Sequence, residues 1–215
     1  LTGTPEQTRN ARAFFDADPR LDKLWLKESK SSVIPFSKLK VRIRHEIIAF
    51  DGPEAGDRQL SRPQAPAIAP ASVQQWLDEG RDFTLLDTRN TYEIESGTFS
   101  VAEHLNIAHF RDFQSAVKEA LEKGELDRNK PIVTFCTGGI RCEKASAYYK
   151  HKGFKNVYQL EGGIIEYTRQ VNDGNLENKF MGKNFVFDHR RGERISDEVI
   201  AHCHQCGKAC DTHVN

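Results

Sequence analysis

The sequence predicts an α/β fold in which helices cover both faces of a parallel sheet. Short apolar segments typical of strands alternate with helical segments across residues 67–178, and strands that alternate with helices form parallel sheets. Two turns from strand to helix contain paired glycines, Gly138-Gly139 and Gly162-Gly163. Because ligands of parallel sheets bind at the carboxyl ends of the strands, we expect the functional site at one of these turns.

Residues 1–50 have the pattern of a small α+β unit. A helix is predicted over 8–17, where Asp18-Pro19 ends it, and strands are predicted over 24–28 and 38–48. In the second strand, apolar residues alternate with four cations, which are Lys38, Lys40, Arg42 and Arg44. A period of two places the cations on one face. A half-buried strand with a solvated face explains this pattern, and a basic ribbon that contacts RNA is the alternative.

Residues 51–66 are predicted to be a linker because they are rich in Gly, Pro and charge and lack apolar periodicity. The α/β pattern then occupies residues 67–178. Its predicted helices cover 71–79, 113–123, 142–149 and the residues after Gly162-Gly163, and its predicted strands cover 83–86, 132–135 and 157–160. Residues 179–215 lose this alternation, and we expect them to form a separate C-terminal segment.

Composition limits the classes of function. The 31 basic residues balance the 31 acidic ones, so any basic surface for nucleic acid must be local. The chain has no apolar run long enough to span a bilayer, no apolar signal-peptide core, and no visible nucleotide-cofactor, haem, flavin or iron motif. Its five cysteines, an odd number, do not suggest a disulfide framework. We therefore expect a cytoplasmic protein without a membrane partner.

The loop Cys136-Thr137-Gly138-Gly139-Ile140-Arg141 is the predicted reactive site. A loop between a strand and a helix N-terminus can turn several backbone N–H groups inward, and paired glycines allow the tight curvature. The residues of this anion cradle are Thr137, Gly138, Gly139, Ile140 and Cys142. The helix dipole and Arg141 should lower the pKa of Cys136 below the roughly 8.5 of a free cysteine. The thiolate would be the nucleophile, and a buried cysteine beside a glycine-rich turn is the alternative.

Other residues near this loop have two interpretations each. Cys142 could capture an oxidised Cys136 as a disulfide, or it could be a small buried helix residue. Asp87 and Arg89 follow a buried strand, where an ion pair that locks two loops is favoured over a catalytic role. Together with Glu93 they are expected to support the reactive loop. The Gly162-Gly163 turn has no nucleophile and is expected to permit close backbone packing.

Three of these features together resemble the rhodanese domain over roughly residues 67–175. They are Asp87-Thr88-Arg89 with Glu93, the loop from Cys136 to Arg141, and Leu160-Glu161-Gly162-Gly163. The resemblance implies that Cys136 accepts sulfur as a persulfide and that the loop, with Arg141, holds an anion. Four residues separate Cys136 from Arg141, whereas cysteine-dependent phosphatases have five, so sulfur chemistry is favoured over phosphate hydrolysis.

Three longer strings resemble a narrower family. They are Cys136 to Ala145 (CTGGIRCEKA), Gly182 to Asp188 (GKNFVFD) and His202 to Gly207 (HCHQCG), and they are similar to the bacterial tRNA uridine hydroxylases. This resemblance implies a partial ferredoxin-like domain at residues 1–50 and a cysteine-rich tail. It also implies tRNA as partner, molecular oxygen as co-substrate and 5-hydroxyuridine at the wobble position as product. A persulfide-forming sulfurtransferase using thiosulfate or a persulfide donor, and a non-catalytic RNA-binding or sulfur-carrier module, are the alternatives.

The C-terminal segment contains two further candidate sites. The cations Lys183, Arg190 and Arg191 lie among three phenylalanines, a mixture that binds phosphates and stacks bases. Aromatic residues that dock the segment on the domain would give the same pattern. The cluster Cys203, Cys206, Cys210 and His213 supplies enough soft ligands for one tetrahedral zinc ion. A cysteine cluster without metal is the alternative.

Overall fold

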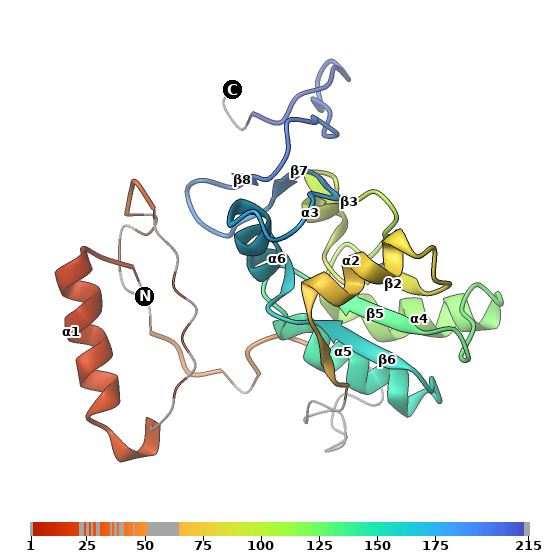
Figure 1. The fold of residues 1–215 in the computed structure, drawn as a ribbon, viewed down its shortest axis with the longest axis horizontal. Coiled ribbons are helices and arrows are strands. Elements are labelled where there is room, and N and C mark those ends of the chain that lie inside the picture. Colours follow the sequence, from red (N-terminus) through yellow and green to blue (C-terminus); the bar gives the residue numbers. More distant parts are fainter. Residues whose placement is uncertain are drawn as a thin grey trace. The chain divides into compact units, whose positions relative to one another are not determined.

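The computed structural model describes residues 2–21, 24, 26, 28, 31–34, 36, 38, 41–44, 46–50 and 65–212. The chain forms two compact units, each of which is described by itself (Figure 1). The smaller unit comprises Leu1–Arg44 with Phe187–Arg191, and the larger comprises His45–Val186 with Gly192–Asn215.

The smaller unit contains the helix α1 (Pro5–Asp16), followed by the short 3₁₀ helix η1 (Pro19–Leu21). The side chain of Thr4 accepts a hydrogen bond from the Gln7 N–H at 3.3 Å, and Gln7 Oε1 accepts one from the Thr4 N–H at 2.9 Å. This reciprocal capping, with Pro5 at the first helical position, explains why the helix begins before the predicted residue 8.

The two strands predicted for this region are not found among its described residues, so the prediction is wrong there. Residues 24, 26, 28, 38, 41–44 and 46–48 lie outside any strand, and the rest of both ranges lies outside the described residues. Val41 and Ile43 are 84% and 101% exposed, so the alternation buries no apolar face at these positions. The predicted linker 51–66 also lies largely outside the described residues, but Ala65 is buried in the larger unit.

The larger unit is built on a five-stranded sheet with the order β1-β6-β5-β2-β4. All of its pairings are parallel. The strands are β1 (Ala67–Ile68), β2 (Thr84–Asp87), β4 (Glu103–His104), β5 (Ile132–Phe135) and β6 (Val157–Leu160). All four residues of β5 are buried, because this central strand has neighbours on both edges and cover on both faces.

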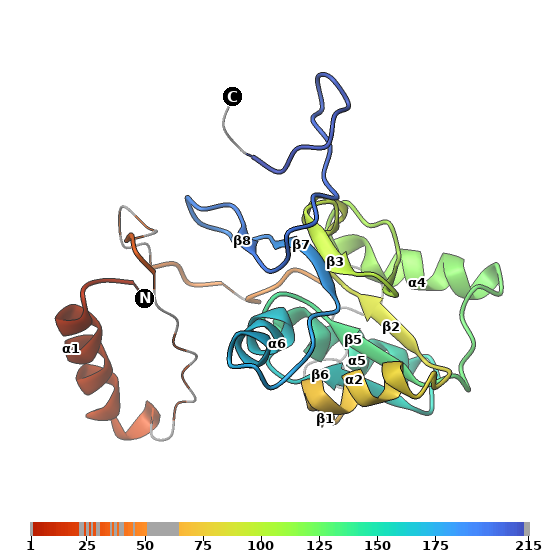
Figure 2. The same ribbon diagram turned by 45° about the horizontal axis from the view of Figure 1, so that its top comes forward.

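Helices cover both faces of this sheet, as predicted (Figures 1 and 2). One core contains residues of α4 (Phe113–Glu122) and α5 (Ile140–His151) against Leu86 and Ile132. The opposite core contains residues of α2 (Pro70–Asp78) and α6 (Gly163–Asn172) against Leu85 and Val133. Neighbouring residues of one strand thus point into different cores, which is the period expected of a strand. None of the helices in the described ranges combines the length and apolar character needed to cross a membrane.

A second, antiparallel sheet corrects the expectation that residues 179–215 form a separate segment. It has the order β3-β7-β8, with β3 (Gly97–Phe99), β7 (Phe180–Asn184) and β8 (Glu193–Arg194), and Figure 2 shows β7 beside β3. Phe180 is 2% exposed and packs edge-on against Phe99 with ring centroids 5.3 Å apart. A Cβ at Gly97 would collide with the backbone of Lys183, so the close approach of these strands requires glycine.

Candidate active site

Cys136 lies directly after the central strand β5, and α5 begins four residues later at Ile140. The residue before α5, Gly139, has a φ of +92°, a left-handed conformation that favours glycine. A Cβ on Gly139 would meet no atom within 4 Å, so glycine is required here by the backbone conformation and not by crowding. The tight loop predicted between strand and helix is present.

The Gly162-Gly163 turn and the start of α6 pack against the backbone of the reactive loop. The Ile164 N–H donates to Cys136 O and the Ile165 N–H donates to Thr137 O, both at 3.0 Å. Gly163 has a φ of +64°, and a Cβ there would lie 2.5 Å from Cys136 O. The close backbone packing expected at this second turn is therefore confirmed, and its neighbour is the reactive loop itself.

The Cys136 side chain is fully buried and is surrounded by hydrogen-bond donors. The Gly139 N–H donates to its Sγ at 3.1 Å. Burial alone raises the pKa of Cys136. The opposing effects are larger and lower it to about 5: they are a hydrogen bond from Cys142, the charge of Arg141, and hydrogen bonds from the N–H groups of Arg141 and Gly138. Burial raises the pKa of Cys142 well above its ordinary value, and the neighbouring Cys136 raises it further. The pair therefore holds one thiolate, on Cys136, at neutral pH.

Arg141 is fixed by a two-point ion pair with Glu93. The distances are 2.6 Å from Arg141 Nη1 to Glu93 Oε2 and 2.7 Å from Nη2 to Oε1. Thr137 Oγ1 lies 3.3 Å from Arg141 Nη2 and 3.4 Å from Glu93 Oε1. Burial lowers the pKa of Arg141, but Glu93 and the Cys136 thiolate raise it more, so the guanidinium stays charged. Glu93 is thus a direct partner of the loop arginine.

Glu93 is supplied by the four-residue helix α3 (Thr91–Ile94). Its Oε2 accepts a hydrogen bond from the Asn90 N–H at 3.1 Å, which fixes the carboxylate at the start of the helix. Thr88, directly after β2, donates its hydroxyl to Phe135 O at 2.8 Å, and its Oγ1 lies 3.8 Å from Cys142 Sγ. In the sequence, Thr88 is noted only within the string Asp87-Thr88-Arg89 and is assigned no role, although its position after a strand next to β5 is the signal that places it here.

Asp87 and Arg89 form a different and fully buried ion pair. Arg89 Nη2 lies 2.6 Å from Asp87 Oδ2 and also donates to Gly97 O at 2.6 Å. Thr98 Oγ1 donates to Asp87 Oδ2 at 2.9 Å. These contacts join the carboxyl end of β2 to β3, in agreement with the interpretation of the pair as an ion-pair lock.

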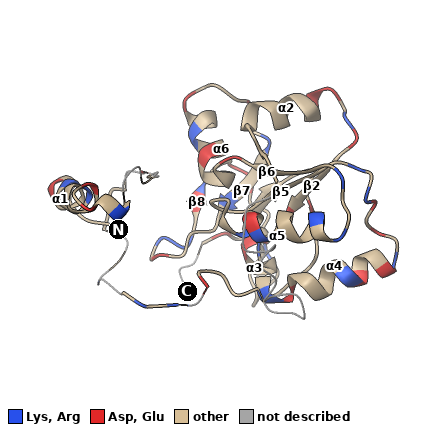
Figure 3. Ribbon diagram, turned by 90° about the horizontal axis from the view of Figure 1, so that it is seen from below, with Lys and Arg blue, Asp and Glu red and all other residues tan. Residues whose placement is uncertain are grey.

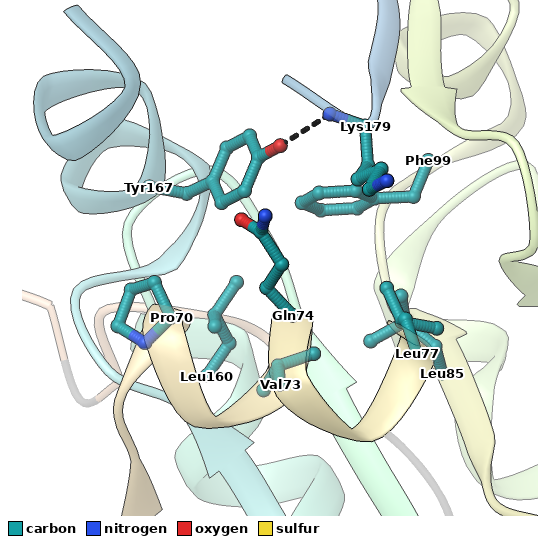
Figure 4. Close-up of a pocket in the computed structure, with 9 residues that line it drawn as sticks. All are labelled: Pro70, Val73, Gln74, Leu77, Leu85, Phe99, Leu160, Tyr167 and Lys179. Carbon is teal, nitrogen blue, oxygen red and sulfur yellow. Dashed lines mark hydrogen bonds between the residues drawn. The ribbon is translucent and has the colours of Figure 1, made fainter. Parts of the chain in front are cut away.

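A cavity under α2 is too small to be a substrate site (Figure 4). Its volume is about 10 Å³, and its lining includes Val73, Leu85, Phe99 and Tyr167. The Lys179 N–H donates to Tyr167 Oη at 2.6 Å, as drawn in Figure 4. A cavity of this volume is at the lower limit for a single water molecule, so this cavity is not a substrate site.

The cations predicted to contact RNA have different surroundings. Lys38, Arg42 and Arg44 are exposed, and Lys40 lies outside the described residues. Lys183 lies 3.3 Å from a carboxylate oxygen of Asp211, Arg190 lies 2.7 Å from one of Asp188, and Arg191 is exposed. Elsewhere both signs of charge are interspersed, as Figure 3 shows along α4. RNA contact by these residues stays a prediction.

The tail cysteines surround a tight turn. The Gly207 N–H donates to Cys203 O at 2.8 Å and the Cys210 N–H donates to Ala201 O at 2.9 Å. The Cys206 N–H is the main cause of a lowered pKa of Cys203. Across residues 65–212, no three or more His, Cys, Asp or Glu side chains are arranged to hold a metal ion, and His213 lies outside the described residues. Zinc binding stays a prediction.

Comparison with known families agrees with this architecture. The rhodanese-like domain family matches residues 69–170, the family described as rhodanase C-terminal matches residues 181–215, and the UPF0176 acylphosphatase-like domain matches residues 1–47. The chain is therefore a rhodanese-domain protein, with Cys136 in the loop that follows the central strand.

Its relatives define a narrower family. The chain is 46% identical over 214 residues to the tRNA uridine(34) hydroxylase of Pectobacterium carotovorum, covering 94% of this chain and 55% of the relative. It is 44% identical over 224 residues to the tRNA uridine(34) hydroxylase of Photorhabdus laumondii, covering 97% of this chain and 59% of the relative. The chain is similar to these relatives over nearly its whole length and spans somewhat more than half of theirs. A solved rhodanese-like domain from Anabaena sp. is 19% identical, with a TM-score of 0.44 over 55% of this chain and 80% of that chain.

Proposed function

We propose that the protein takes part in tRNA modification and hydroxylates the wobble uridine to 5-hydroxyuridine, with Cys136 as the reacting residue. The observation that carries this proposal is the buried thiolate of Cys136, which N–H groups and Arg141 stabilise at the carboxyl end of β5. The names of the relatives support the substrate, because they are called tRNA uridine(34) hydroxylases. Molecular oxygen would be the co-substrate.

A thiolate can activate a uracil ring by adding to C6. This addition makes C5 electron-rich, so that C5 can accept an oxygen atom from the oxidant. Loss of the C5 proton and cleavage of the C6–S bond would then restore the ring and the thiolate, while a two-electron donor reduces the second atom of molecular oxygen to water. A thiolate whose pKa is about 5 is a good leaving group, which suits the last step.

A cytoplasmic location follows from this proposal, because tRNA is the partner and because the thiol must stay reduced. All five cysteines are free thiols in the structure. In a reducing compartment Cys136 and Cys142 would not be lost as a permanent disulfide.

Mass spectrometry of tRNA nucleosides tests the proposed function. Cells that lack the protein should lose 5-hydroxyuridine, wild type should restore it, and Cys136→Ser should not. Cys136→Ser changes one buried sulfur to oxygen and leaves the loop sequence otherwise intact. Restoration by Cys136→Ser would indicate a non-catalytic role, and an unchanged level in the deletion strain, in a background without another route to the product, would contradict the hydroxylase proposal.

A persulfide-forming sulfurtransferase is the second candidate, and the specific observation in its favour is the rhodanese-type loop. The thiolate of Cys136 is well suited to accept sulfane sulfur from a thiosulfate or persulfide donor. A thiosulfate-to-cyanide assay distinguishes the two candidates. Strong Cys136-dependent turnover, without any effect on tRNA nucleosides, would favour the sulfurtransferase.

A further inference from the structure

Cys136, Arg141 and Glu93 together carry a net negative charge when the cysteine is ionised, and we call these three residues with the loop from Thr137 to Cys142 the cradle. Glu93 engages both terminal nitrogens of Arg141 at 2.6 and 2.7 Å, and its side chain is completely buried. The positive and negative charges of this pair cancel, which leaves the charge of the thiolate. An anion brought to this buried position would be repelled, whereas an uncharged ring would not be. The charge balance therefore favours an uncharged substrate.

Three large apolar side chains are exposed on segments that lie next to the reactive loop. Tyr92, Ile140 and Ile165 are 41%, 44% and 40% exposed. Each belongs to a segment that builds the cradle: Tyr92 precedes Glu93, and Ile140 precedes Arg141. The third, Ile165, donates its N–H to Thr137 O at 3.0 Å. We call these three residues the rim.

Tyr92 is held in place although its side chain is exposed. The Asn90 Nδ2 donates to Tyr92 Oη at 3.0 Å. The Tyr92 ring packs edge-on against Phe185, with centroids 5.3 Å apart and an interplanar angle of 79°. A ring that is already fixed loses little conformational entropy when a ligand stacks on it. Tyr92 is therefore a suitable platform for a flat ligand.

Access to Cys136 requires passage through the residues around it. The Cys136 side chain is fully buried, so a substrate cannot reach it without passing the exposed residues of the loop and its neighbours. At Gly139 the space in the direction of a Cβ is open for 4 Å. A flat ring could approach on this side, where Ile140 is the exposed residue of the loop.

We propose that the rim, formed by Tyr92, Ile140 and Ile165, receives an unpaired pyrimidine base of RNA and that Tyr92 stacks on this base. The inference rests on the proposed function for the identity of the polymer, and it deepens that function by assigning the residues that recognise the base. The pyrimidine fits the two observations together, because it is uncharged, as the cradle favours, and has an aromatic face, as the rim favours. A thiosulfate or phosphate ion is negatively charged and has no aromatic face, so these two features favour the base over the anionic sulfur donor of the second candidate function.

The first test measures binding of an RNA hairpin with one unpaired uridine in its loop, compared with the same hairpin with an abasic residue at that position. Tyr92→Ala should weaken binding of the uridine hairpin about ten-fold, the order expected for loss of one stacked base, and Ile140→Ala should weaken it less, because it removes apolar contact without an aromatic face. Binding of the abasic hairpin should not change. Tyr92→Phe keeps the ring but loses the hydrogen bond from Asn90, so it should bind more tightly than Tyr92→Ala and no more tightly than wild type. Val101→Ala, at an apolar residue that is 55% exposed after β3, is the matched control.

Equal binding of the two hairpins by wild type, or no effect of Tyr92→Ala on their difference, would overturn the rim as a base-binding site. If either result is found while formation of 5-hydroxyuridine still depends on Cys136, the proposed function is unaffected and only the rim is ruled out. Tyr92→Ala could instead weaken binding of the uridine hairpin alone, while Cys136→Ser still restores 5-hydroxyuridine. That result would contradict the proposed function and support the rim as a base-binding site.

The second test measures the charge preference of the cradle with two alkylating reagents of similar size, uncharged iodoacetamide and anionic iodoacetate. The ratio of their rates at Cys136, followed by peptide mass spectrometry and normalised to the ratio for a free thiol, does not depend on the thiolate fraction. Wild type should favour iodoacetamide, and Glu93→Gln should shift the ratio toward iodoacetate by roughly ten-fold or more, because one buried negative charge is removed. A wild-type preference for iodoacetate would overturn the charge argument even if Glu93→Gln did not fold.

Discussion

Glu93 and Arg141 are 48 residues apart in the chain, yet they form a two-point ion pair beside the reactive cysteine. The Glu93 side chain is fully buried and that of Arg141 is 8% exposed. The pair joins α3 to the first turn of α5, so it fixes the guanidinium whose charge stabilises the Cys136 thiolate. Without Glu93, the buried Arg141 guanidinium would lose its two-point partner and keep only the Cys136 thiolate as a counter-charge.

Removal of the Glu93 carboxylate should therefore destabilise the fold strongly. We expect Glu93→Ala to lower the free energy of unfolding by about 3–5 kcal/mol, as measured by urea denaturation, because Arg141 would remain buried and charged. Glu119→Ala is the control, because the Glu119–Lys123 pair is more than half exposed and such pairs contribute about 0–1 kcal/mol. Equal losses in the two variants would contradict the stabilising role of the buried pair.

The ionisation of Cys136 should appear in its reactivity. The rate of alkylation by iodoacetamide should rise with pH around a midpoint near 5, far below the ordinary value of 9.0. Cys142→Ala removes the hydrogen-bond donor that contributes most to this lowering and should move the midpoint upward. Cys142→Ser keeps a donor of similar size and should retain a midpoint closer to wild type. A wild-type midpoint near 9 would show that the cradle does not stabilise the thiolate.

The same ionisation should link stability to pH. The pKa of Cys136 is lower in the folded protein than in the unfolded chain, so the unfolded chain binds the proton more tightly. The stabilisation from the thiolate is fully present above about pH 9 and is lost as the pH falls toward 5. The difference in unfolding free energy between wild type and Cys136→Ser should therefore grow in favour of wild type from pH 5 to pH 9. A difference that stays constant over this range would contradict the linkage.

The long elements of the α/β unit could be predicted because burial leaves a clear pattern in the sequence. The strands Ile132–Phe135 and Val157–Leu160 agree with their predicted bounds, since they are compact apolar segments. The elements that escaped prediction are short: β1 and β4 have two residues each and α3 has four, too few to show a period. β7 does alternate between buried and partly buried residues, but its buried positions include Gly182 and Asn184, so hydrophobicity does not reveal it.

The candidate nucleophile Cys136 lies in one continuous loop of the sequence, whereas its partners depend on strand order. Asp87 pairs with Phe135 in the sheet, which brings the residues that follow β2 beside those that follow β5. Only this register explains why Thr88 contacts Cys142 and why Glu93 meets Arg141. The rim depends on the same arrangement, because it combines residues of α3, α5 and α6.

The packing of Gly163 against the reactive loop gives the last prediction. A Cβ at this position would lie 2.5 Å from Cys136 O and 2.9 Å from Gly139 N, so Gly163→Ala must displace the loop that holds the thiolate. Gly174→Ala is a matched control, because Gly174 also has a left-handed φ, +74°, but a Cβ there would meet no atom within 4 Å. The control should lose about 1 kcal/mol of stability from backbone strain and keep the alkylation midpoint of Cys136. Gly163→Ala should shift that midpoint upward, because the N–H donors move away from the sulfur. An unchanged midpoint in a folded Gly163→Ala protein would show that the second glycine turn does not position the reactive loop.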